Sequence, residues 1–284
     1  MEIVTRAPRM TLHSREARAR GERIGFVPTM GALHQGHLSL IRRARQVSTL
    51  VVVSVFVNPT QFGPGEDYAR YPRDLTRDAD LAREAGAAIL YAPDEREVYP
   101  SGFGTAVTVV GLDSVLEGAS RPGHFRGVAT VVAKLLNRVA PDVVLFGQKD
   151  AQQAVIIRRM VRDLEMDVEI EICPTVREAD GLALSSRNAY LGPEERRAAP
   201  VLYRALRRAE SAIVSEEERD PERVLSLIRE TVAAEPLVSL EYAAVVDGET
   251  LQPLEKIRGS VLIPLAARLG ATRLIDNILV KVEE

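Results

Sequence analysis

The chain contains little of several residue types, and each shortage excludes a class of protein. Cys173 is the only cysteine among the 284 residues, so a disulfide within the chain and a four-cysteine zinc site are both excluded. The lack of cysteine pairs is typical of a reducing compartment. The longest apolar run, residues 50–57, is far shorter than the ~20 residues of a membrane helix. Residues 1–20 lack the apolar centre of a secretory signal, so we expect a cytoplasmic protein with no membrane partner.

Lysine is also scarce, and only Lys134, Lys149, Lys256 and Lys281 are present. Lysine and arginine together number 37 against 40 aspartates and glutamates, which gives a net charge of −3. This balance provides no broad basic field, so no nucleic-acid partner is expected. Because arginine carries nearly all of the positive charge, a lysine within a polar motif deserves a chemical explanation.

Apolar segments of strand and helix type alternate along the first 175 residues. Residues 24–28 form a short apolar segment, and an amphipathic helix is predicted at 37–47. Residues 50–57 form a β-branched run typical of a strand buried on both faces of a parallel sheet. The alternation then predicts helices at 74–85, 127–139 and 150–164 and strands at 89–91, 142–146 and 168–172. This pattern predicts an α/β fold with a doubly wound, Rossmann-like parallel sheet, whose ligands lie beyond the carboxyl ends of the strands.

The pattern changes after residue 174. Two predicted helices, at 193–215 and 221–234, come first, and three strand-like segments follow at 240–246, 261–267 and 273–280. Helices grouped before strands indicate a smaller α+β domain. We therefore expect a Rossmann-like domain of residues 1–175 and an α+β domain of residues 176–284.

Polar residues gather in four loops that follow predicted strands. Because the carboxyl ends of parallel strands meet at one edge of a sheet, we expect these loops to converge on one ligand. The loops comprise residues 29–37, 58–65, 147–153 and 174–188.

His34 and His37 stand three residues apart at a predicted helix start. Backbone N–H groups and the helix dipole favour an anion such as phosphate at such a position. Two alternatives stay open from the spacing alone: a capping histidine with an exposed neighbour, or two zinc ligands. Zinc is disfavoured because His13 and His124 are the only other imidazoles and Cys173 is distant in sequence.

Two further polar segments suit a nucleotide. Lys149 and Asp150 follow a predicted buried strand; the lysine could follow phosphate oxygens and the aspartate could accept from ribose hydroxyls, although a salt bridge between them is the simpler alternative. Ser185, Ser186 and Arg187 offer two hydroxyls and a guanidinium, the donors that a triphosphate requires, or form no more than a turn.

Six segments together resemble the pantoate–β-alanine ligase family over nearly the whole chain. The HQGH element alone indicates only the wider HxGH nucleotidyltransferase superfamily. The segments are PTMGALHQGHLSL (28–40), SVFVNPTQFGPGEDYARYPR (54–73), RPGHFRGVATVVAKLLN (121–137), FGQKDAQQ (146–153), READGLALSSRNAYL (177–191) and RLGATRLIDNI (268–278).

The resemblance implies an ATP-dependent condensation of pantoate with β-alanine. The pantoate carboxylate would attack the α-phosphorus of ATP to give pantoyl adenylate and pyrophosphate, and the amine of β-alanine would then displace AMP. Mg²⁺ would accompany the ATP, and the family implies a homodimer whose smaller C-terminal domain covers the site.

The resemblance also assigns roles to residues at matching positions. Catalytic roles would fall to His34, His37 and Lys149. Pantoate would be bound by Gln61 and Gln153, with Asn58 beside them. ATP would be bound by Pro28, Met30, His34, His37, Gly147, Lys149, Asp150, Val176, Ser185, Ser186 and Arg187.

Some points stay open on the sequence. Residues 63–68 have the glycines and length of a lid, or form an inert surface loop. Asp74, Asp78 and Asp80 are candidates for magnesium, but Asp74 could equally cap a helix, so the metal site is unassigned. Two other functions are alternatives: another HxGH nucleotidyltransferase of cofactor biosynthesis, and a non-catalytic nucleotide sensor.

Overall fold

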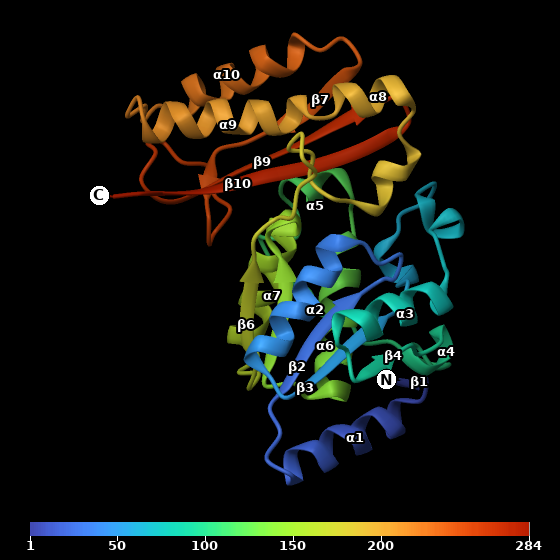
Figure 1. The fold of residues 1–284 in the computed structure, drawn as a ribbon. Coiled ribbons are helices and arrows are strands. Elements are labelled where there is room, and N and C mark those ends of the chain that lie inside the picture. The colour runs from blue at the N-terminus through green and yellow to red at the C-terminus, as the bar shows by residue number, and fades with distance from the viewer. Residues whose placement is uncertain (284) are drawn as a thin grey trace. The chain divides into compact units, whose positions relative to one another are not determined.

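The computed structural model describes residues 1–283 and divides into two compact units (Figure 1). The first unit comprises residues 1–147 and 156–174. The second comprises residues 148–155 and the chain from 175 onward. The chain therefore leaves the first unit at the end of a strand and returns within a helix, α7 (Ala151–Asp163). The sequence pattern did not indicate that residues 148–155 pack with the C-terminal part.

The first unit contains a six-stranded sheet with the order β1-β4-β3-β2-β5-β6, in which every neighbouring pair is parallel. This confirms the predicted doubly wound α/β fold. Strand β3 ends at Val55, two residues before the predicted end. The strands are β1 (Glu2–Val4), β2 (Ile24–Thr29), β3 (Leu50–Val55), β4 (Ile89–Tyr91), β5 (Val143–Gly147) and β6 (Glu169–Cys173).

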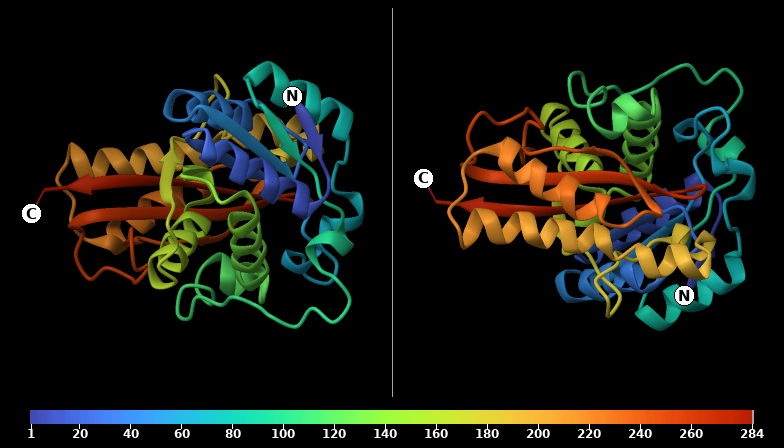
Figure 2. Two further views of the ribbon diagram at one scale, coloured as in Figure 1. Left: turned by 90° about the horizontal axis from the view of Figure 1, so that it is seen from below. Right: turned by 90° about the horizontal axis from the view of Figure 1, so that it is seen from above.

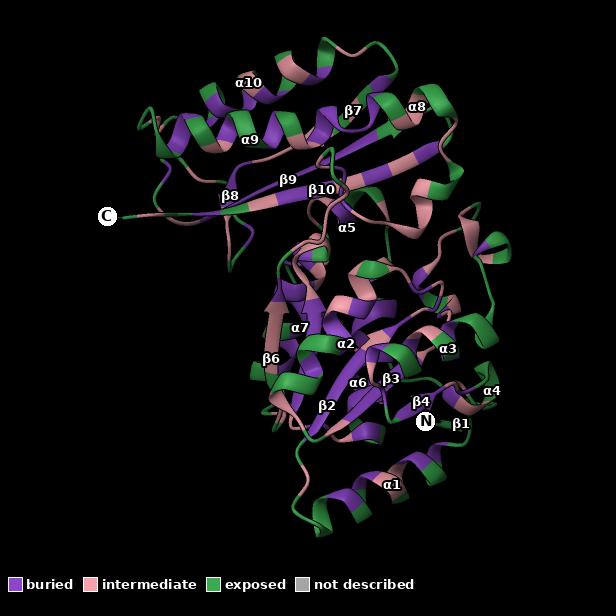
Figure 3. Ribbon diagram, viewed as in Figure 1, coloured by how far each residue is buried: buried purple, intermediate pink, exposed green. Residues whose placement is uncertain are grey.

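Helices cover both faces of this sheet, and its central strands are buried (Figure 3). On one face, apolar side chains of β2, β3, β4 and β5 pack against α2 (Gln35–Val47) and α3 (Leu75–Ala85). On the other face, α1 (Ala7–Ala19) packs against α6 (His124–Val139). Helix α6 begins three residues before its predicted start. The order of the strands reverses between β2 and β5, so the carboxyl ends of these two strands form the switch point at which such sheets bind ligands.

Strand β1 and helix α1 were not predicted. The residues that α1 buries are Ala7, Met10, Ser14 and Ala17, a small and partly polar set that produces no apolar stripe. Helix periodicity depends on such a stripe, so the sequence carried no signal for α1.

The second unit is built on a long antiparallel hairpin of β9 (Gly259–Leu269) and β10 (Thr272–Val282). Strands β7 (Val238–Ala243) and β8 (Val246–Asp247) both pair with β9. Helices α9 (Val201–Val214) and α10 (Pro221–Ala233) lie side by side on one face of this sheet (Figures 1 and 2). The predicted helix at 193–215 is two helices, α8 (Pro193–Ala198) and α9, because Pro200 interrupts it.

Short helices occupy the loops that follow the strands. They are η1 (Pro59–Gln61), η2 (Asp67–Arg70), α4 (Glu95–Val98), α5 (Glu117–Ser120), η3 (Gln148–Asp150) and η4 (Ser186–Tyr190). Helix α6 packs closely on η1 because Gly127 has no side chain; a Cβ there would overlap the main chain of Thr60. This close approach places the start of α6 against Gln61.

Candidate active site

The start of helix α2 is capped by the two predicted histidines. His34 is the N-cap residue, and its Nδ1 accepts from the N–H of Gly36 at 3.2 Å. The N–H of His34 donates in turn to Nδ1 of His37 at 3.3 Å, and the ring centroids are 4.1 Å apart. Because both Nδ1 atoms accept, each neutral ring carries its proton on Nε2. The capping alternative is therefore confirmed for His34, whose ring caps the helix through Nδ1.

A buried carboxylate shapes the turn that leads into this helix. Gly31 and Ala32 both have positive φ, at 88° and 51°. Asp78 accepts from the N–H groups of Ala32 and Leu33 at 2.9 and 2.8 Å. Burial raises the pKa of Asp78, and the two N–H groups oppose this change. Asp78 thus fixes the approach of the chain to His34.

The other two aspartates that were candidates for magnesium also have partners within the protein. Asp74 caps α3 through the N–H of Arg77, and Asp80 pairs with Arg83. Within residues 1–283, no group of three histidine, cysteine or acidic side chains could hold a metal ion. The donor set for a resident metal is thus not assembled from Asp74, Asp78 and Asp80.

Asn58 and Gln61 form a buried hydrogen-bonded pair. Asn58 Nδ2 donates to the carbonyl of Gly127 and to Oε1 of Gln61, both at 3.1 Å. Its Oδ1 accepts from the hydroxyls of Tyr99 and Thr60, at 2.7 and 2.9 Å. A backbone carbonyl only accepts, so the orientation of the Asn58 amide follows from the contact with Gly127. The orientation of Gln61 follows from Asn58 in turn.

The amide nitrogen of Gln61 faces the loop after β2. Its Nε2 lies 3.0 Å from the sulfur of Met30, which is a weak acceptor. The structure therefore brings Gln61 together with a residue predicted to bind ATP. Both hydrogens of the Asn58 amide are used within the protein, and one of them holds the side chain of Gln61.

The main-chain carbonyl of Gln61 is held separately, from the start of α6. His124 Nδ1 lies 2.8 Å from this oxygen, and Arg121 donates to it at 3.3 Å. Burial, followed by the charge of Arg121, lowers the pKa of His124 from 6.5 to about 4. Arg121 also binds Glu66, and this hydrogen bonding lowers the pKa of Glu66.

In the second unit, β10 supports the turn that carries Lys149. Asn277 Nδ2 donates to the carbonyls of Gln148 and Lys149, at 3.1 and 2.9 Å, and its Oδ1 accepts from the Gln148 amide. Lys149 is mostly buried and lies 3.9 Å from Asp150. The salt bridge that the sequence offered as an alternative is therefore long, while the lysine main chain is firmly held.

The neighbouring residue of β10 supports the loop before Ser185. Arg177 forms a two-pronged ion pair with Asp276, at 2.6 and 2.9 Å, and its guanidinium lies 3.9 Å from the centre of the Tyr203 ring. Ser185 Oγ accepts from the N–H of Arg187 and so caps η4. Strand β10 therefore fixes both polar turns of this unit.

Asp276 and Asn277 support predicted site residues, and in the sequence they stood out only as part of the RLGATRLIDNI motif. Both are at most 4% exposed. A signal was present, because these two polar residues interrupt an otherwise apolar strand, Leu274 to Val280. Buried polar residues persist only where they have partners.

The remaining predicted residues are divided between the two units. Pro28 lies in β2 and Gly147 ends β5, in the first unit. Asp150, Gln153 and Val176 lie in the second unit. The structure thus gathers the predicted residues into two sets, one in each unit: Pro28, Met30, His34, His37, Asn58, Gln61 and Gly147; and Lys149, Asp150, Gln153, Val176, Ser185, Ser186 and Arg187.

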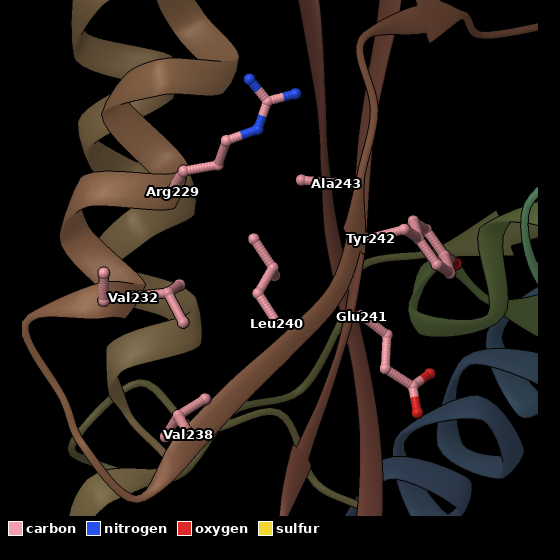
Figure 4. A pocket seen from close by; sticks show the side chains of 8 residues that line it. Arg229, Val232, Val238, Leu240, Glu241, Tyr242 and Ala243 are labelled. Carbon is pink, nitrogen blue, oxygen red and sulfur yellow. The ribbon is translucent and has the colours of Figure 1, made fainter.

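A cavity of about 470 Å³ lies in the second unit between α10 and β7. Figure 4 shows Arg229 and Leu240 pointing into it and Tyr242 pointing away. Its lining contains none of the predicted site residues. Glu241 at its edge pairs with Arg268 and Arg273. We therefore do not place the active site in this cavity.

The fold and the capped helix start define the class of protein: a doubly wound α/β protein whose first central strand leads into a helix start, a position at which such folds bind ligands. The chain belongs to the pantoate–β-alanine ligase family, whose sequence model matches residues 2–279. The family and ligase activity predicted from the motifs are confirmed.

Relatives named pantothenate synthetase match the whole chain. Those of Heliobacterium modesticaldum and Moorella thermoacetica are 56% and 55% identical, over 99% and 100% of this chain and 100% of each relative. The crystal structure of pantothenate synthetase from Thermus thermophilus has a TM-score of 0.92 at 50% identity, covering 98% of this chain and 99% of that one.

A ligase from Francisella tularensis, whose structure is described as complexed with β-γ ATP and β-alanine, has a TM-score of 0.80 at 36% identity. It covers 98% of this chain and 97% of its own. Within residues 1–283, no helix has the length and apolar character needed to cross a membrane.

We predict that His124 makes stability depend on pH. The unfolded chain protonates His124 near the ordinary pKa of 6.5, and the folded chain only near 4. The unfolded state therefore binds more protons in this window, so the free energy of unfolding rises with pH and is lost as pH falls. Urea unfolding of wild type and His124→Asn should differ by about 2 kcal/mol more at pH ~7 than at pH ~5. A constant difference would mean that His124 titrates normally in the folded protein.

Proposed function

We propose that the chain condenses pantoate with β-alanine through a pantoyl-adenylate intermediate. The pantoate carboxylate forms a bond to the α-phosphorus of ATP, and the bond to pyrophosphate breaks. The amine of β-alanine then attacks the acyl carbon, AMP leaves with the electron pair of the broken C–O bond, and the amine loses a proton. The protein supplies no nucleophile, because pantoate provides it.

The orientation of the Gln61 amide carries this proposal. Its Oε1 is occupied by Asn58, so the amide presents Nε2–H to a ligand. A carboxylate is a far better acceptor than the sulfur of Met30, which now lies against Nε2. Burial raises the pKa of Tyr99, which keeps its phenol protonated as a donor to Asn58. The contact with Asn58 therefore holds the oxygen of the Gln61 amide and directs its Nε2–H away from Asn58.

Neutral donors suit a nucleophilic carboxylate. An arginine would stabilise the negative charge of the attacking group before the reaction and so lower its reactivity. An amide positions the same oxygens with less stabilisation of their charge. We propose that Gln61 and Gln153 both bind pantoate in this way, and that Asn58 orients Gln61.

The phosphates require charge, since adenylation moves negative charge onto the α-phosphorus and the leaving pyrophosphate. We propose that His34, His37 and Lys149 stabilise this charge. Ser185, Ser186 and Arg187 would hold the triphosphate. Residues around the nucleoside would be Pro28, Met30, Gly147, Asp150 and Val176.

We propose magnesium as part of the substrate, carried on the phosphate oxygens of ATP. Asp74, Asp78 and Asp80 are already bound to protein donors, so they do not form a resident site. The metal would neutralise phosphate charge when bound.

We also propose a cytoplasmic homodimer in which residues 1–175 bind nucleotide and pantoate and residues 176–284 act as a lid. The resemblance to the family supports the dimer and the lid. Val110, which is 88% exposed, and the exposed Phe103 add apolar surface that a second copy could cover.

The two alternative functions predict different products. A nucleotidyltransferase would leave the nucleotide on its product, and a nucleotide sensor would consume no ATP. With ATP, Mg²⁺, pantoate and β-alanine, we expect AMP and pyrophosphate in a 1:1 ratio with pantothenate, and neither without pantoate. Chromatography of the reaction mixture checks this outcome. ADP and inorganic phosphate as products would show an acyl-phosphate mechanism and overturn the proposal.

Lys149→Ala should lower the rate of adenylation by ~10²–10³, the usual cost of removing one preorganised donor from a transition state. Lys149→Arg should also be poor, because a planar fork does not replace a compact ammonium. The exposed Lys256 of the same unit provides the control, and Lys256→Ala should keep wild-type kinetics. Rapid-quench measurement of pyrophosphate formation checks the rate of adenylation. Wild-type rates in a folded Lys149→Ala would assign the lysine a structural role.

A further inference from the structure

A closed set of polar contacts joins the loop after η1 to the start of α6. Arg121 donates to both carboxylate oxygens of Glu66, through Nε at 2.8 Å and Nη2 at 2.5 Å. It also donates to the carbonyl of Gln61, and its Nη1 lies 3.1 Å from Nε2 of His124. His124 Nδ1 completes the set at the carbonyl of Gln61.

The chemistry of the partners fixes the tautomer of His124. A guanidinium only donates, so Nε2 of His124 accepts from Arg121. Nδ1 then carries the proton and donates to Gln61. Phe125 packs edge-on against the imidazole at a centroid distance of 4.8 Å. Both nitrogens of one neutral ring are therefore used to connect Arg121 with the main chain of Gln61.

Glu66 is the member of this set that restrains the glycine-rich segment. Gly63, Pro64 and Gly65 precede it, and Gly65 has a φ of +82° with open space around its α-carbon. Within the segment, the N–H of Glu66 donates to the carbonyl of Gly63 at 3.2 Å. Glu66 and Arg121 are largely buried, at 26% and 18% side-chain exposure. The ion pair also neutralises the guanidinium beside Gln61.

We propose that Glu66, Arg121 and His124 form a latch of positioning residues for pantoate. The proposal rests on the proposed role of Gln61. Asn58 fixes the side chain of Gln61 and the latch fixes its main chain, so both ends of the residue are held. Reacting groups displaced by ~1 Å can lose ~10²-fold in rate, which makes restraint of the main chain matter. The latch restrains the main chain of Gln61 without placing an uncompensated cation beside the pantoate carboxylate.

Two substitutions at His124 separate the hydrogen bond from simple packing. The amide nitrogen of asparagine lies near the position of Nδ1, so His124→Asn keeps a donor for Gln61. The amide of glutamine lies near Nε2, so His124→Gln loses that donor. The quantities to measure for each variant are KM for pantoate, KM for ATP and kcat, with folding checked by circular dichroism.

The expected results differ between substrates. His124→Gln and Arg121→Ala should raise KM for pantoate by ~10-fold and lower kcat by ~10–100-fold, through misplacement of Gln61. His124→Asn should restore both values to within ~3-fold of wild type, and KM for ATP should change by less than ~3-fold throughout. Glu66→Gln should speed proteolysis within residues 63–66. The matched control is Glu169→Gln, which breaks the exposed Arg23–Glu169 pair of the same unit; it should behave as wild type.

Three results would overturn the latch. The first is wild-type kinetics in folded Arg121→Ala and His124→Gln. The second is an equal rise in KM for ATP and pantoate, which indicates general loosening. The third is His124→Asn being as impaired as His124→Gln. In all three cases the wild-type protein still forms AMP when pantoate is present. If the proposed function itself is wrong, the wild-type protein forms no pantoate-dependent AMP.

Discussion

The buried amide of Asn58 is the constraint from which the chemistry of the first unit follows. The carbonyl of Gly127 fixes its orientation, Asn58 then fixes that of Gln61, and the Nε2–H of Gln61 thereby points away from Asn58. This contact requires a glycine at position 127, because a side chain there would overlap Thr60. A small residue in α6 thus sets, through two amides, the orientation of the side chain that we propose to bind pantoate.

In the second unit, buried polar residues likewise hold the predicted site residues in place. Asp276 and Asn277 lie next to each other in β10; one holds Arg177 and the other holds the main chain of Lys149. A long β hairpin is a rigid support, and sites on such elements keep their geometry better than sites on loops. Lys149 and the Ser185–Arg187 turn therefore both lie in loops that are supported by strand β10.

The sequence predicted the sheet and the order of its main elements, because these depend on periodicity, and its local motifs assigned residues to the substrates. It did not predict the supporting residues. Asp78 contacts Leu33 across 45 residues of sequence, and Asn277 contacts Lys149 across 128. Local spacing does not identify the partner in such a contact, even where a polar residue such as Asn277 stands out within an apolar strand. Asp78 was instead considered for magnesium, since a lone carboxylate in a sequence does not reveal whether backbone N–H groups already occupy it.

Exchange of labelled pyrophosphate into ATP tests the central claim, an adenylate formed before β-alanine acts. The account predicts exchange that requires pantoate and proceeds without β-alanine, because the first step is then complete and reversible. Gln153→Glu should abolish it, since a second carboxylate would repel the first. Exchange that strictly requires β-alanine would contradict the account and indicate a concerted reaction.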